Sequence, residues 1–160
     1  MRATRGMRWA VWLVCVATLV ACASGPVRRV SEPSARIQQL TVLADGSWTA
    51  DLRIENFSSI PMRFDSFQFA MKIAEQDAGT LSAQPALTIG PESADVISVT
   101  VSPTVAAKLA VADGLAGRQG VQYSLDGTVT ATPDEQRQRE FKVKRSSALS
   151  PAPGLPGVLR

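Results

Sequence analysis

Apolar and polar side chains alternate with a period of two in at least five segments between residues 35 and 145. In 48–55, for example, Trp48, Leu52 and Ile54 alternate with hydroxyl or charged side chains, and the pattern recurs in 67–73, 97–101, 121–131 and 140–144. Successive side chains of a strand point to opposite faces, so the pattern predicts half-buried antiparallel strands. Such strands must pair into sheets that bury their apolar faces together.

Turn residues separate these segments. Asp45-Gly46 predicts a hairpin between two strands because both residues tolerate positive φ, and Gly90-Pro91 predicts another turn. Asp126-Gly127 fits either a hairpin turn or a bulge within one long strand.

The segment 102–114 departs from the period of two. It begins with Ser-Pro and ends in glycine, which predicts a helix near Pro103–Ala112 with Val105 and Leu109 on its packed face together with Ala112. About seven short strands and one short packed helix predict a mostly-β fold, a fibronectin- or immunoglobulin-like β-sandwich.

The N-terminus has the features of an export signal. Arg2, Arg5 and Arg8 precede a 13-residue apolar run that ends at Ala21. A membrane-spanning helix needs about 20 apolar residues, so the run fits a signal peptide better than a span.

The sequence Leu19-Val-Ala-Cys22 that ends this run resembles the lipobox of bacterial lipoproteins. The resemblance implies acylation of Cys22, cleavage after Ala21, and a lipid anchor in the bacterial outer membrane facing the periplasm. Ordinary signal cleavage after Ala23 is the alternative.

These features divide the chain into four predicted segments. Residues 1–21 are the predicted lipoprotein signal peptide, 22–34 a flexible tether, 35–145 the sandwich domain, and 146–160 a disordered tail rich in Pro, Gly and Ser. Removing 1–21 removes three arginines and leaves 14 basic against 14 acidic residues, so the basic balance gives no indication of a nucleic-acid partner.

Composition argues against several kinds of chemistry. The chain has no histidine, and its two cysteines both lie within the first 22 residues. We expect no enzyme activity, metal site or cofactor. Asp51, Arg53 and Glu55 share one strand face and could form a charged site, although a solvated outer sheet face is the simpler interpretation. The glycines at 114, 117 and 120 lack the lysine of a phosphate loop.

Two further clusters have alternative interpretations. A basic cluster on the last predicted strand could contact anionic headgroups or an acidic partner, or could protect a sheet edge from unwanted pairing; it comprises Arg137, Arg139, Lys142, Lys144 and Arg145. The aromatic residues Phe64, Phe67 and Phe69 are expected in the core rather than in a binding cleft.

The order of these elements resembles that of late embryogenesis abundant (LEA) type 2 proteins, the water stress and hypersensitive response domain. The resemblance covers residues 33 to 143 and rests on three short motifs: Ile54-Glu-Asn56 with Ile60-Pro61, the valine-rich strand 96–101, and Tyr123 with Gly127. Phe57 replaces the proline that follows the asparagine in the family.

The resemblance implies a sandwich with a packed helix and a link to water stress. We therefore expect a non-enzymatic, anchored protein that protects envelope components or binds client proteins. A structural subunit of an envelope-spanning secretion or transport complex is the alternative.

Overall fold

The computed structural model describes residues 28–160. The predicted signal peptide, the cleavage after Ala21 and the acylated Cys22 lie outside the described residues. Within residues 28–160, no helix combines the length and the apolar character needed to cross a membrane.

The described chain consists of strands and one helix, α2. In chain order the elements are β1 (Ser34–Val42), β2 (Trp48–Asn56), β3 (Met62–Ile73), β4 (Gln76–Ala83), β5 (Leu87–Ile89), β6 (Ser93–Val101), α2 (Val105–Gly117), β7 (Val121–Pro133), β8 (Arg139–Leu149) and β9 (Val158–Leu159).

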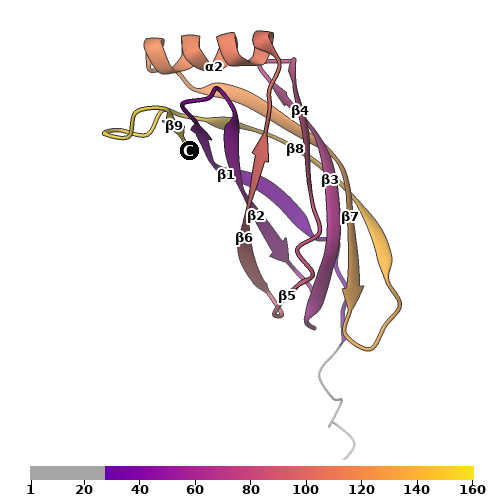
Figure 1. Ribbon diagram of the computed structural model, residues 1–160. Coiled ribbons are helices and arrows are strands. Elements are labelled where there is room, and N and C mark those ends of the chain that lie inside the picture. The colour runs from indigo at the N-terminus through magenta and orange to yellow at the C-terminus, as the bar shows by residue number, and fades with distance from the viewer. Residues whose placement is uncertain (1–27) are drawn as a thin grey trace, which may run out of the picture.

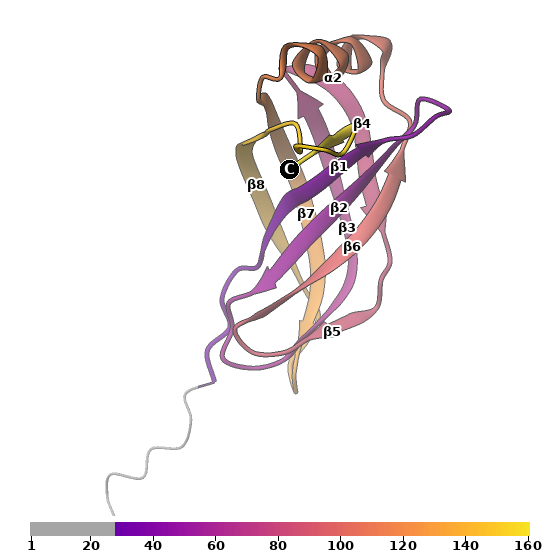
Figure 2. The same ribbon diagram turned by 90° about the vertical axis from the view of Figure 1, so that its left-hand side faces the viewer.

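The strands form two antiparallel sheets that pack face to face (Figure 1). One sheet has the order β6-β2-β1-β9, and the other has the order β4-β3-β7-β8 with β5 paired to β3. Viewed from the side of the first sheet, its strands run obliquely to those behind them, and α2 lies across one end (Figure 2). The predicted β-sandwich is confirmed.

Apolar residues that alternate with polar ones in the sequence are the buried residues of the strands. Every second residue of β2 from Trp48 to Asn56 is buried, and the intervening residues are partly exposed. The three phenylalanines of β3 are core residues, as expected, and the rings of Phe67 and Phe69 stack with centroids 5.4 Å apart. The two sheets therefore share one continuous apolar core.

Gly127 lies inside β7 and belongs to neither a hairpin turn nor a bulge. It pairs with Phe69 of β3 on one side and with Val143 of β8 on the other, and both ladders continue through it without a shift of register. A Cβ atom at Gly127 would lie 2.0 Å from the carbonyl oxygen of Gln68. Glycine is needed here because the two backbones approach closely.

Asn56 connects two loops at the end of β2. It is 1% exposed, and its Nδ2 donates hydrogen bonds to the carbonyl oxygens of Ile60 (3.0 Å), Ile89 (3.1 Å) and Gly90 (2.9 Å). Its Oδ1 accepts one from the backbone N–H of Ser58 at 2.9 Å. This side chain thus connects the loop after β2 with the end of β5 by satisfying their backbone groups.

Helix α2 differs from its prediction in both its bounds and its packed face. Thr104 is the N-cap and accepts a hydrogen bond from the backbone N–H of Ala107, while Arg118 ends the helix in the left-handed conformation. The buried residues are Ala107, Val111 and Gly114, whereas Val105, Leu109 and Ala112 are exposed. Gly114 is a contact residue and not a stop, because a Cβ there would lie 2.3 Å from Cγ2 of Val121.

The predicted boundaries at 34/35 and 145/146 are also wrong. In the predicted tether, Arg28 forms ion pairs with Asp134 (3.2 Å) and Glu135 (3.1 Å), and the backbone N–H of Ser31 donates to Oγ of Ser58. These contacts hold residues 28–33 against the domain.

The predicted disordered tail belongs to the fold. Strand β8 continues to Leu149, and β9 pairs with β1 through Leu40 and Leu159, both fully buried. The Pro- and Gly-rich residues 150–157 form the turns that bring β9 to the edge of β1. The composition of residues 146–160 predicted disorder because composition carries no information about strand pairing between distant parts of the chain.

Candidate functional site

The basic cluster lies along β8, which is the edge strand of its sheet, and in the loop before it. Lys144 pairs with Asp126 across the sheet (3.0 Å), and Nη2 of Arg139 donates to the side chain of Gln136 (2.8 Å). All five basic residues are exposed. Their position on an edge suits protection against unwanted strand pairing, and a contact with anionic groups stays a prediction.

The charged residues of β2 form a paired network on the outer sheet face. Nε of Arg53 lies 2.9 Å from Oε1 of Glu55, and Oε2 of the same carboxylate accepts a hydrogen bond from Oγ of Ser34. The hydrogen bond from Arg53 is the largest cause that lowers the pKa of Glu55, and burial opposes it. Asp51 accepts a 2.6 Å hydrogen bond from Oγ of Ser98. A carboxylate kept ionised in this way is suited to an ion pair rather than to general acid catalysis.

Helix α2 presents an apolar stripe to solvent at one end of the sandwich. Val105 is 74% and Leu109 is 60% exposed, and Ala112 and Ala116 continue the same helical face. The β7–β8 turn, with which Arg28 forms an ion pair through Asp134, lies at the opposite end (Figure 1). We call these four helix residues the distal stripe.

A groove adjoins the C-terminal half of α2. It has a volume of about 750 Å³, and it is lined by Leu115 and Arg118 of the helix and by residues 150–157, including the 45% exposed Leu155. On its buried side, α2 packs on β3, β4 and β7. The groove and the distal stripe together give this end of the molecule an apolar surface.

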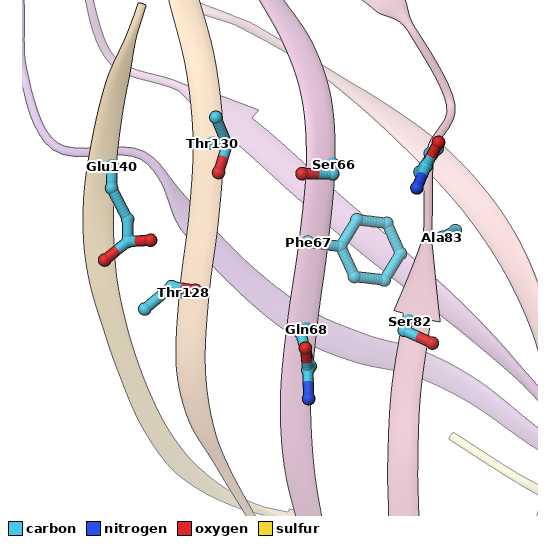
Figure 3. Close-up of a pocket in the computed structure, with 9 residues that line it drawn as sticks. Ser66, Phe67, Gln68, Ser82, Ala83, Thr128, Thr130 and Glu140 are labelled. Carbon is cyan, nitrogen blue, oxygen red and sulfur yellow. The ribbon is translucent and has the colours of Figure 1, made fainter.

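A second depression lies on the outer face of the other sheet (Figure 3). Its volume is about 520 Å³. It is centred on the place where β3 changes register against β7, between Phe64 and Ser66, and where β3 passes from pairing with β5 to pairing with β4. A bulge of this kind bends the strand and interrupts the sheet surface.

Polar side chains from neighbouring strands line this depression. The register places Thr130 opposite both Ser66 and Glu140, and it places Gln68 opposite both Thr128 and Ser82. With Gln84 these are seven polar side chains, and within residues 28–160 none of the seven has a hydrogen bond or ion pair with another side chain or with the backbone. We call this set the hydroxyl depression.

Asp65 fixes the bulge at the border of the depression. Its carboxylate accepts hydrogen bonds from Thr132 (2.7 Å) and Gln138 (3.0 Å), and it lies 2.6 Å from Nη2 of Arg63. The hydrogen bond from Gln138, followed by that from Thr132, holds the pKa of Asp65 below its ordinary value. An ionised Asp65 therefore links β3, β7 and the loop before β8.

The hydroxyl depression was not predicted from the sequence. The one local signal was the spacing of Phe64 and Phe67, which are both buried although they are three residues apart. This break in the period of two marks the bulge. In the sequence, the polar residues of the depression could not be distinguished from those of an ordinary solvent-exposed strand face.

No family model and no curated protein matches the sequence. Among solved structures, the chain is similar to a protein of Arabidopsis thaliana, AT1g01470, with a TM-score of 0.51 and 11% identity over 81% of this chain and 87% of that one. It is also similar to a putative LEA protein, At2g46140.1 (TM-score 0.48, 14% identity, 96% and 87% covered), and to a protein from Archaeoglobus fulgidus (0.40, 12%, 78% and 98%). At these identities the likeness to AT1g01470 concerns the fold, and it agrees with the sandwich described above.

Proposed function

We propose that this chain is a non-enzymatic, lipid-anchored protein of the LEA type 2 kind. It protects envelope components during desiccation or osmotic stress by binding exposed apolar segments of partly unfolded proteins. The observation that carries the proposal is the distal stripe. The motifs shared with LEA type 2 proteins and the lipobox-like sequence before Cys22 support the class and the anchor.

Helix α2 is apolar on two opposite sides. A helix that covers a core normally has polar residues on its outer face, yet Val105 and Leu109 occupy that face here. The charged residues of the helix are Lys108 and Asp113. Exposed apolar surface of this kind is typical of contact sites, and the scarcity of charge favours apolar clients over charged ones.

A lipid anchor at Cys22 would leave the distal stripe facing the periplasm. Cys22 lies six residues before Arg28, so the connecting chain spans roughly 20 Å at most. Arg28 forms ion pairs with the β7–β8 turn, which lies at the end opposite α2 (Figure 1). A short connection at that end keeps the sandwich near the bilayer and directs the distal stripe away from it, toward proteins of the periplasm.

The test measures aggregation of a heat-denatured reporter enzyme by light scattering in the presence of the full chain. We expect suppression by the wild type and at least fivefold weaker suppression by Leu109→Asp. Val96→Asp is the matched control, because Val96 is an exposed apolar residue (39%) on β6, away from the helix. Equal suppression by all three proteins, or none by the wild type, would overturn client binding.

The anchor is tested separately. Intact mass and detergent partition of the wild type and Cys22→Ser should show acyl groups and membrane association in the wild type alone. Survival after drying should then fall in cells that carry only Cys22→Ser. A stoichiometric envelope complex that copurifies with the lipidated protein would instead support the structural-subunit alternative.

A further inference from the structure

We infer that the hydroxyl depression binds a neutral, polyhydroxylated small molecule, such as a sugar or a linear polyol. This inference does not depend on the proposed function, because the depression and the distal stripe lie on different surfaces. It rests on the chemistry of the side chains, on their arrangement, and on the absence of internal partners for them.

The donors and acceptors of the depression are mostly uncharged. Ser66, Thr128 and Thr130 each offer a hydroxyl that both donates and accepts, as do the hydroxyls of a sugar, and Gln68 offers an amide with both functions. Within residues 28–160 these groups have no partner in the protein. In contrast, two carboxylates that border the depression are paired, Asp65 with Thr132 and Asp126 with Lys144.

The strands hold these groups in a grid. Opposite residues of paired strands have Cβ atoms about 5 Å apart, and residues two apart on one strand are about 7 Å apart. Ser66, Thr130 and Glu140 form one row, and Ser82, Gln68 and Thr128 form the next (Figure 3). A volume of about 520 Å³ lies within the range of small-molecule sites, about 300–1,000 Å³.

The lining also argues against other ligand classes. Glu140 is the one charged side chain in the lining, so an anion would meet a carboxylate there, and Lys142, which the register places opposite Thr128, lies outside the lining. An aromatic ligand would find no ring to stack on, because Phe67 is 3% exposed. A carboxylate accepts charge-assisted hydrogen bonds from two neighbouring hydroxyl groups, which makes Glu140 the strongest expected contact to a polyol.

Titration of the full chain in detergent, with threonine methyl groups labelled for NMR, tests the inference. The probes are sorbitol, maltose and maltohexaose. We expect saturable shifts at Thr128 and Thr130 with millimolar dissociation constants, because hydrogen bonds exchanged with water contribute little net free energy each. Thr49 of β2 and Thr100 of β6, which pair with each other in the other sheet, report general solvent effects. Tighter binding of maltohexaose than of maltose would identify a glycan chain as the ligand. Equal or weaker binding of maltohexaose would identify a free solute as the ligand.

Two variants and one control complete the test. Glu140→Gln should weaken binding about tenfold, because a neutral acceptor replaces a charged one. Thr130→Val should weaken it severalfold, read at Thr128, while Thr100→Val should leave it unchanged. All three positions are at least partly exposed, so the variants should fold. Shifts that grow linearly and equally at all four threonines, or unchanged affinity of Glu140→Gln, would overturn the inference.

Discussion

Replacing Gly127 with alanine should lower the free energy of unfolding by about 2–4 kcal/mol. The new Cβ would lie 2.0 Å from the carbonyl oxygen of Gln68 and 2.8 Å from Cα of Phe69. Both are backbone atoms of β3, a central strand that β4 holds from its other side. Relief therefore requires β3 and β7 to separate by about 1 Å, since real Cβ contacts do not fall below 3.0 Å.

The magnitude combines three effects. Overpacking in a well-packed sheet typically costs about 1–3 kcal/mol. Each ladder hydrogen bond that lengthens loses up to about 1 kcal/mol. The smaller conformational freedom of alanine in the unfolded chain returns about 0.4–1 kcal/mol. The net effect remains destabilising because the atoms in the way are backbone atoms that no rotamer change can move.

Urea unfolding followed by far-ultraviolet circular dichroism measures this difference. Gly117→Ala is the matched control, because a Cβ there would lie 3.6 Å from the side chain of Gln119, an ordinary contact, in the last turn of α2. The control should be neutral or stabilised by up to about 1 kcal/mol. A free energy of unfolding for Gly127→Ala within about 0.5 kcal/mol of the wild-type value would contradict this expectation.

Three other substitutions test the remaining structure by the same urea unfolding assay. Asn56→Ala should cost about 3 kcal/mol, because it leaves four buried or partly buried backbone groups without their partner; a loss below about 1 kcal/mol would contradict this role. Asp65→Asn should be less stable than the wild type at neutral pH, and this difference in the free energy of unfolding should shrink as the pH falls below about 4. The reason is that the contacts that lower the pKa of Asp65 stabilise the fold only while its carboxylate is ionised. A difference that is constant from pH 7 to pH 2.5 would contradict this expectation. Leu159→Ala should cost about 2–5 kcal/mol, because this fully buried side chain belongs to the core, whereas an unchanged urea midpoint would show that β9 is dispensable.

The sandwich could be predicted because its strands are half-buried. Trp48, Leu52 and Ile54 alternate with polar residues, and that alternation determines which face of β2 meets the core. The face of α2 could not be predicted in the same way. Val105 and Leu109 on one side and Ala107 and Val111 on the other are all apolar, so periodicity alone cannot choose between the two sides.

Two other features could not be predicted either, for different reasons. Ser102 and Thr104 are both capping residue types, so the sequence did not show which of them begins the helix. The residues of the hydroxyl depression come from four strands, and only the register between those strands brings Gln68, Thr130 and Glu140 together. Such a site cannot be inferred from any one segment.

The single tyrosine of the chain connects the two sheets. The backbone N–H of Ile37 in β1 donates to the hydroxyl oxygen of Tyr123 in β7 at 3.2 Å, next to the point where β1 shifts register against β2. The hydroxyl group is enclosed in the core, so its proton can exchange with solvent only when the sheets part. The exchange rate of that one proton would therefore report how often the sandwich opens in the native state, without any added label.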